Sequence, residues 1–94
     1  LVMTGEGHTS WLSGVDFHPH GSHLATSSGD GTVKVWEFAQ AKCMYTFAEH
    51  TNSVWSAKFH HGGDHLASCS TDHTVRIRPP VFYVAYLSLS PLFF

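Results

Sequence analysis

Short runs of apolar and polar residues, separated by turn-forming clusters, occupy most of the chain. The run 12–18 (LSGVDFH) alternates loosely and ends at Pro19. The cluster HPHGS at 18–22 has the composition of a turn, and it leads into a second run, HLATSS at 23–28. This pattern predicts two consecutive β-strands joined by a short loop.

A tight turn and two more strands follow. The sequence GDG at 29–31 supplies residues that can adopt positive φ, so it predicts a hairpin into TVKVWEF at 32–38. Apolar side chains fall on both sides of 32–38, which is typical of a strand that is covered on both faces. A fourth predicted strand, CMYTF at 43–47, completes the set.

The whole pattern then recurs. When 7–36 is laid over 49–78 without a gap, 12 of 30 positions are identical, and the offset is 42 residues. A period in the low forties, with GH at one end and Trp at the other, is typical of the four-stranded blade of a β-propeller rather than of a helical array. The predicted fold is therefore all-β: a partial propeller of two four-stranded antiparallel blades, the second incomplete.

The repeat also divides the chain. We assign 1–8 to a lead-in from a preceding blade, 9–48 to the first repeat, 49–78 to an incomplete second repeat, and 79–94 to an apolar tail without repeat character. Closed propellers use about 4 to 8 blades. We therefore expect this chain to be a piece of a larger domain, to lack stability as an isolated monomer, and to associate through uncovered sheet faces and edges.

The tail breaks the repeat pattern, since it opens with Pro79 and Pro80 and carries no charge. Three interpretations are open: a replacement strand for the second blade, a non-native end from altered splicing or gene prediction, and a sticky terminus. We favour the second because the apolar run matches no blade element. It is also too short for a membrane span, which needs about 20 residues.

Composition narrows the possible partners. Five basic residues are scattered and outnumbered by seven acidic ones, so the chain lacks the basic footprint of a nucleic-acid binder. Cys43 and Cys69 have no short spacing, which favours free thiols in a reducing compartment over a disulfide. No secretory signal is visible at the start. We predict no membrane partner and no cofactor.

One constellation imitates a catalytic triad. His8, Asp30 and a hydroxyl from Thr26 or Ser28 could form a proton relay. No sharp strand-to-helix turn presents a serine nucleophile, however, and all these residues fall within one predicted sheet. A structural role is therefore the favoured interpretation, and no catalytic residue is assigned.

Nine histidines raise the question of a metal site. Five of them flank the two equivalent loops: His18, His20, His60, His61 and His65. No cysteine or carboxylate stands at ligand spacing, so we expect exposed loop residues and no metal.

The motifs together resemble the WD-repeat family over residues 5–78. The resemblance rests on Gly7-His8, on the Ser-x-Asp-x-Thr turn at 28–32, and on Trp36-Glu37 where the family has Trp-Asp. It implies a structural tetrad whose members in this sequence are Asp30, His8, Thr26 and Trp36.

The second repeat departs from this pattern. The corresponding residues are Asp72, His50 and Ser68, while Arg78 stands where the family has Trp and Glu49 where it has Gly. We therefore expect the second blade to be less firmly anchored.

The resemblance also implies a function. WD-repeat proteins are non-enzymatic interaction scaffolds, and this sequence resembles, more narrowly, those of the central apparatus of motile cilia and sperm flagella. That implies axonemal or microtubule-associated protein partners, together with the remaining blades of a full propeller. The alternative is an adaptor of another complex, such as a ubiquitin ligase or a signalling scaffold, which would share the fold without the location.

Overall fold

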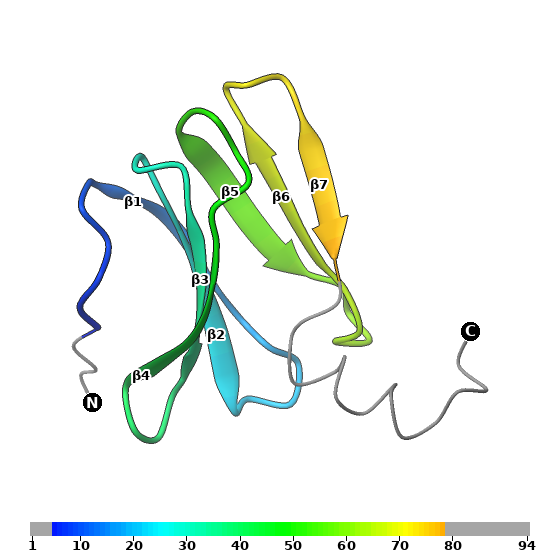
Figure 1. Ribbon diagram of the computed structural model, residues 1–94. Helices are drawn as coiled ribbons and strands as arrows, with labels where there is room; N and C mark the ends of the chain where they lie inside the picture. The colour runs from blue at the N-terminus through cyan, green and yellow to red at the C-terminus, as the bar shows by residue number, and fades with distance from the viewer. Residues whose placement is uncertain (1–4, 79–94) are drawn as a thin grey trace.

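The computed structural model describes residues 5–78, which form two antiparallel β-sheets (Figure 1). The first sheet has the order β1-β2-β3-β4 and the second the order β5-β6-β7. The strands are β1 Leu12–Phe17, β2 His23–Ser28, β3 Val33–Glu37, β4 Lys42–Phe47, β5 Val54–Phe59, β6 Leu66–Ser70 and β7 Val75–Arg78. The predicted fold class is confirmed, with a four-stranded first blade and three strands in the second. The interpretations of the 79–94 tail fall outside the described residues.

The strand register places the predicted site residues on one face of the first sheet. Thr26 pairs with Lys34, and Leu24 pairs with Trp36. Side chains of a strand alternate between faces, so Thr26 and Trp36 lie diagonally across β2 and β3, within reach of each other.

Within residues 5–78 no helix is long and apolar enough to cross a membrane.

The two β-hairpins that join β2 to β3 and β6 to β7 use the same turn with different residues. Gly31 has φ of +87° in the first turn, as the sequence predicted for this segment, and His73 has φ of +70° at the matching position of the second. A non-glycine residue in the left-handed region is strained. The second turn therefore adopts its conformation at some cost, which neighbouring hydrogen bonds must offset.

The hydrophobic core lies between the two blades. Buried side chains from β2 and β3 of the first sheet meet buried side chains from β5 and β6 of the second: Ala25, Val33, Val35, Val54, Ala57 and Leu66. Phe47 and Phe59 pack against this cluster. The blades are thus stacked face to face, and Figure 1 shows the two sheets side by side.

Polar contacts also cross between the blades. The Ser13 hydroxyl donates to the Val54 carbonyl at 2.6 Å, and the Phe59 amide donates to Asp16 Oδ2 at 2.8 Å. His18 Nε2 lies 3.0 Å from the Gly63 carbonyl oxygen. These bonds fix the position of one blade on the other, because each satisfies a polar group that would otherwise be buried without a hydrogen-bond partner.

The structure corrects one expectation about the loop histidines. His18 is buried, with 5% of its surface exposed, whereas the sequence predicted an exposed loop side chain. Its ring fills the seam between the blades, where it meets the Phe59 ring at 5.1 Å between centroids. The error arose because a turn residue of one blade becomes an interior residue once the second blade packs on it.

Candidate functional site

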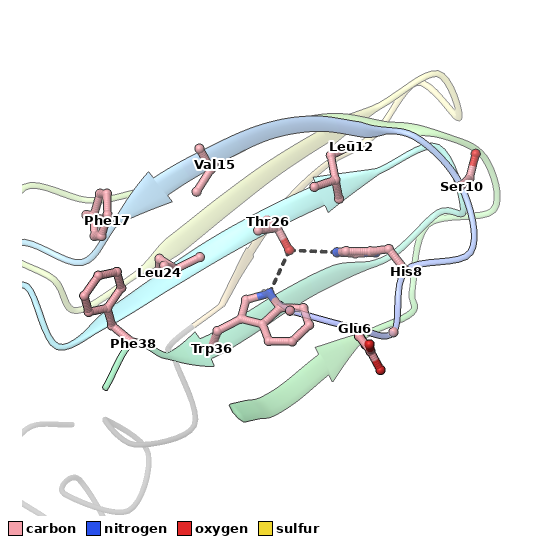
Figure 2. Close-up of a pocket in the computed structure, with 12 residues that line it drawn as sticks. Glu6, His8, Ser10, Leu12, Val15, Phe17, Leu24, Thr26, Trp36 and Phe38 are labelled. Atoms are coloured by element: carbon pink, nitrogen blue, oxygen red, sulfur yellow. Dashed lines mark hydrogen bonds between the residues drawn. The ribbon is translucent and has the colours of Figure 1, made fainter. Parts of the chain in front are cut away.

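The predicted tetrad residues of the first blade come together at the edge of an exposed sheet face. Figure 2 shows His8, Thr26 and Trp36 in this arrangement. His8 Nδ1 lies 3.0 Å from Asp30 Oδ2, and His8 Nε2 lies 2.7 Å from Thr26 Oγ1. The Trp36 indole N–H donates to the same Thr26 oxygen at 2.9 Å. The loop before β1, strand β2, strand β3 and the turn between these two strands are thereby joined in one continuous chain of hydrogen bonds.

One arrangement of the protons, with a proton on His8 Nδ1, satisfies every group in this network. The Trp36 N–H donates to Thr26 Oγ1, the Thr26 hydroxyl donates to His8 Nε2, and the His8 Nδ1–H donates to Asp30. The side chains of His8 and Asp30 are 7% and 10% exposed. Polar groups this well buried are costly to leave unpaired, so the network constrains how the strands and the preceding loop pack.

Asp30 is also the organising residue of the hairpin turn. Besides His8, it accepts hydrogen bonds from the Thr9 amide at 3.0 Å and the Thr32 amide at 2.9 Å, and from the Thr32 hydroxyl. Burial by itself would raise the pKa of Asp30, but the hydrogen bonds from Thr32, Thr9 and His8 outweigh it and hold the pKa well below its ordinary value. The carboxylate is therefore ionised throughout the physiological range.

Ser28, the alternative partner for His8, has a different role. Its hydroxyl accepts from the Asp30 amide at 3.1 Å, and the residue is fully buried. Of the two hydroxyls considered from the sequence, Thr26 is the one that contacts the histidine.

The second blade repeats the arrangement without the indole. His50 Nδ1 lies 2.9 Å from Asp72 Oδ2, and His50 Nε2 lies 2.8 Å from Ser68 Oγ. Hydrogen bonds from the Thr74 side chain lower the pKa of Asp72, an effect that desolvation opposes and that His50 and the Thr51 amide reinforce. These distances are close to those of the first blade, so the predicted difference in anchoring concerns only the missing indole donor.

The two departures from the family motif contact each other. The Arg78 guanidinium is paired with the Glu49 carboxylate, and Arg76 lies 3.6 Å from the same carboxylate. The Arg78 guanidinium also lies over the Phe47 ring, 4.6 Å from its centroid. An ion pair and a cation–π contact thus occupy the place of the Gly and Trp of the motif. Sequence reasoning noted both substitutions and missed that they are partners; their coincidence in one repeat was the available signal.

The geometry of the triad-like residues suits a structural role. The Thr26 hydroxyl is buried between the Trp36 indole and His8, and it accepts the indole proton. A nucleophile needs an approach path for its substrate and a base free to take its proton. Here the histidine and the hydroxyl are hydrogen-bonded to each other, the histidine also to Asp30 and the hydroxyl also to the Trp36 indole.

The histidine-rich loops do not converge on a metal position. Among the described residues, no three His, Cys, Asp or Glu side chains are grouped so that they could hold an ion. His60 and His65 instead lie 3.3 and 3.2 Å from the Asp64 carboxylate, on the surface. Cys43 and Cys69 are both free thiols, as expected.

His8, Thr26 and Trp36 line a hollow of about 680 Å³ on the open face of the first blade. Figure 2 shows the apolar side chains of this face, which come mainly from β1 and β2: Leu12, Val15, Phe17 and Leu24. The first three are more than half exposed. The polar network therefore borders an apolar surface that no described residue covers.

Two exposed tryptophans form a second surface feature, which the sequence did not reveal. The rings of Trp11 and Trp55 lie 5.3 Å apart between centroids and are 49% and 53% exposed. They come from different blades, so their pairing depends on how β1 and β5 are stacked. The Trp11 ring also covers Gly29, where an added Cβ would lie 2.4 Å from the indole.

The fold and the site define a class of protein: stacked antiparallel blades, each held by a His–Asp–hydroxyl network, as in repeat propellers. A family model described as "WD domain, G-beta repeat" matches residues 1–37 and 41–78. The chain belongs to the WD-repeat family. Its members are typically non-enzymatic scaffolds that mediate protein interactions.

Relatives with known names cover only parts of the chain. The fission yeast protein "Target of rapamycin complex subunit wat1" (Schizosaccharomyces pombe) is 58% identical over 36 residues, which are 38% of this chain and 12% of that protein. "Lissencephaly-1 homolog 1" of Paramecium tetraurelia is 42% identical over 41 residues, 44% of this chain and 10% of that protein. "Nuclear distribution protein PAC1" of Ajellomyces capsulatus is 39% identical over 49 residues, which are 51% of this chain and 11% of that protein. The chain thus spans about a tenth of each.

Proposed function

We propose that this chain acts as a non-enzymatic scaffold and that the Trp11–Trp55 pair is a contact surface for a partner protein. The observation that carries the proposal is the pair itself: two large, half-exposed indole rings held together across the seam between blades. Tryptophan is among the residues that most often dominate the binding energy of protein interfaces. Family membership supports the general role, since WD repeats mediate protein interactions.

We further propose that the partners are axonemal central-apparatus or microtubule-associated proteins, in the axoneme of motile cilia and sperm flagella. This location has its support in the sequence resemblance of residues 5–78 to WD-repeat proteins of that structure. The role there is assembly and support of motility, for which a rigid blade stack with an aromatic contact surface is suited.

One comparison favours a second candidate, an adaptor of another complex such as a signalling scaffold or the substrate-recruiting part of a ubiquitin ligase. The relative with 58% identity over its matched segment is named as a subunit of the target of rapamycin complex. The other two relatives carry different names, so the choice between complexes requires an experiment.

The experiment compares three tagged forms of the chain in ciliated cells: wild type, Trp55→Ala, and Met44→Ala. Met44 is a matched control because it is also an exposed apolar residue, 42% exposed, on the outer strand β4. Proximity labelling followed by mass spectrometry should recover the same axonemal proteins with wild type and Met44→Ala, and lose them with Trp55→Ala. An unchanged partner set for Trp55→Ala would overturn the contact surface, and partners from a non-axonemal complex would favour the second candidate.

A further inference from the structure

His18 and His60 are equivalent residues, 42 positions apart, in the turns that follow β1 and β5. Each accepts a hydrogen bond on Nδ1 from the amide two residues later, His18 from His20 at 3.1 Å and His60 from Gly62 at 3.1 Å. Their surroundings differ, because His18 is 5% exposed at the seam between the blades, whereas the His60 side chain is 52% exposed. The same turn thus places one titratable ring inside the protein and the other on its surface.

The hydrogen bonds of His18 define the protonation state of its ring. Nδ1 accepts from the His20 amide, so it carries no proton. Nε2 lies 3.0 Å from the Gly63 carbonyl oxygen, which can only accept, so Nε2 carries the proton and donates it. The ring is therefore neutral in this arrangement, with both nitrogens in use. A second proton, on Nδ1, would face the His20 N–H and would place a positive charge at a buried position.

The His18 ring is enclosed by both blades. An added Cβ at Gly63 would lie 2.6 Å from His18 Nε2, and the His18 and Phe59 rings meet edge to face at 5.1 Å between centroids. The Phe59 amide in turn donates across the seam to Asp16 Oδ2 at 2.8 Å. Displacement of the His18 ring therefore separates the turn of the first blade from the second blade at this end of the seam.

The ionisable groups around His18 add to its sensitivity to acid. The His20 ring is stacked on it at 5.1 Å between centroids, and the His23 ring lies 6.4 Å away. Burial and the proximity of His18 lower the pKa of His23, and Glu37 opposes this shift. A histidine whose pKa is lowered on folding stabilises the folded state fully above its unfolded value, near pH 6.5, and loses that contribution as the pH falls. Other titratable residues of the elements packed at this end of the seam are Asp16, His60, His61, Asp64 and His65.

The loop of the second blade responds to acid in the opposite sense. Asp64 Oδ1 lies 3.2 Å from His65 Nδ1 and 3.3 Å from His60 Nδ1. The hydrogen bond from His65 lowers the pKa of Asp64, although desolvation opposes this. A positive charge on either imidazole is stabilised by the carboxylate beside it. We therefore expect mild acid to leave loop 60–65 intact and to act on its contact with His18.

We propose that His18 is a pH-sensitive joint between the two blades, at which protonation of the ring releases the 18–23 turn of the first blade from loop 60–65 of the second. Histidine side chains change charge between about pH 5 and 8, so the joint responds to mild acid. At the other end of β1 and β5 the Ser13 hydroxyl donates to the Val54 carbonyl, a contact that does not titrate in this range. Acid therefore opens the seam from one end only.

Hydrogen exchange of the full 94-residue chain, followed by NMR at pH 7.5 and pH 5.5 and corrected for the intrinsic effect of pH, tests the joint. Both values lie above the ordinary pKa of carboxyl groups, about 4. Protection of the Phe59 amide, which donates across the seam to Asp16, should fall about tenfold at pH 5.5, the effect of one lost hydrogen bond. The Thr32 amide, which donates to Asp30 in the turn between β2 and β3, should keep its protection. Equal protection of Phe59 at both pH values, or an equal loss at Thr32, would overturn the proposal.

Two matched variants assign the response to one ring. His18→Gln retains an N–H that can donate to the Gly63 carbonyl but does not titrate, so Phe59 protection should be the same at both pH values. His60→Gln makes the same change at the equivalent exposed position and should leave the tenfold loss in place. A loss that persists in His18→Gln would contradict the proposal.

A measurement on the wild-type ring keeps the test independent of whether His18→Gln folds. Imidazole ¹⁵N chemical shifts at pH 7.5 should show a proton on His18 Nε2 and none on Nδ1; the reverse assignment would overturn the joint. Trp55→Ala should retain the pH response, because Trp55 lies near the start of β5, at the non-titrating end of the seam. A failure of this proposal is thus distinguishable from a failure of the proposed partner surface.

Discussion

Removal of one hydroxyl from each blade isolates the contribution of the Trp36 indole. Thr26→Val and Ser68→Ala each delete the oxygen that contacts a buried histidine, with little other change of shape. In the first blade that oxygen is also the acceptor for the Trp36 N–H at 2.9 Å, whereas Arg78 stands in the corresponding position of the second blade. Thr26→Val therefore leaves two buried groups, the His8 Nε2 and the Trp36 N–H, without a hydrogen-bond partner. Ser68→Ala leaves one, the His50 Nε2.

The expected magnitudes follow from this count. An unsatisfied buried polar group costs about 1–3 kcal/mol. His8 and Trp36 are both well buried, with a 7% exposed side chain and 3% exposure of the whole residue. We expect Thr26→Val to lower the free energy of unfolding by about 2–5 kcal/mol and Ser68→Ala by about 1–3 kcal/mol. Urea unfolding of the full chain at one fixed protein concentration measures both. That concentration is the same for every variant, because any association between chains would stabilise the folded state.

The control for these two variants is a substitution at a surface turn. Asp64→Ala removes a carboxylate that is 38% exposed and that pairs only with histidines of the same surface loop, so its effect should stay within about 1 kcal/mol. Equal losses for Thr26→Val and Ser68→Ala would mean that the indole adds nothing to the network. The prediction that the second blade is less firmly anchored would then be wrong.

Three further predictions concern single features of the structure. Because the folded-state pKa of Asp30 is lowered, its stabilising effect is complete above the unfolded value near pH 4 and declines as the pH falls below it. Asp30→Asn should therefore make the loss of urea-unfolding stability between about pH 4 and pH 2 less steep, and Asp72, whose pKa is also lowered, should account for a remaining part. Gly21→Ala should cost about 1–2 kcal/mol in urea unfolding, the penalty of positive φ, and Gly63→Ala should cost more because the new Cβ meets a buried histidine ring; equal costs would contradict this packing. Arg78→Ala should lower stability by about 1 kcal/mol, and Glu49→Ala should then add little; fully additive losses in a double-mutant cycle would refute the ion pair.

The sequence predicted the strands well because their signals are local. Alternation set the strands near 12–18 and 23–28, and the GDG turn set the hairpin that follows; the observed bounds differ by about one residue. The repeat added a long-range constraint, since a 42-residue offset with matching turns indicates one structural unit used twice. The fold class could therefore be reached without any knowledge of contacts.

What the sequence could not show depends on how one blade lies on the other. His18 is buried only because the second blade covers it, and Trp11 meets Trp55 only because β1 and β5 are stacked. Glu49 and Arg78 are 29 positions apart, and no local pattern relates them. These contacts arise from packing between sheets, which alternation and turn chemistry do not specify.

The most direct test of the account compares the three indole N–H groups of the chain in one hydrogen-exchange NMR experiment. The account holds that the triad-like residues are committed to the interior of a WD-repeat blade, where the Trp36 N–H is bonded to Thr26. Trp11 and Trp55 are half exposed and serve as internal references. The predicted result is slow exchange of the Trp36 indole proton and fast exchange of the other two. Exchange of the Trp36 proton as fast as that of Trp11 and Trp55 would contradict it.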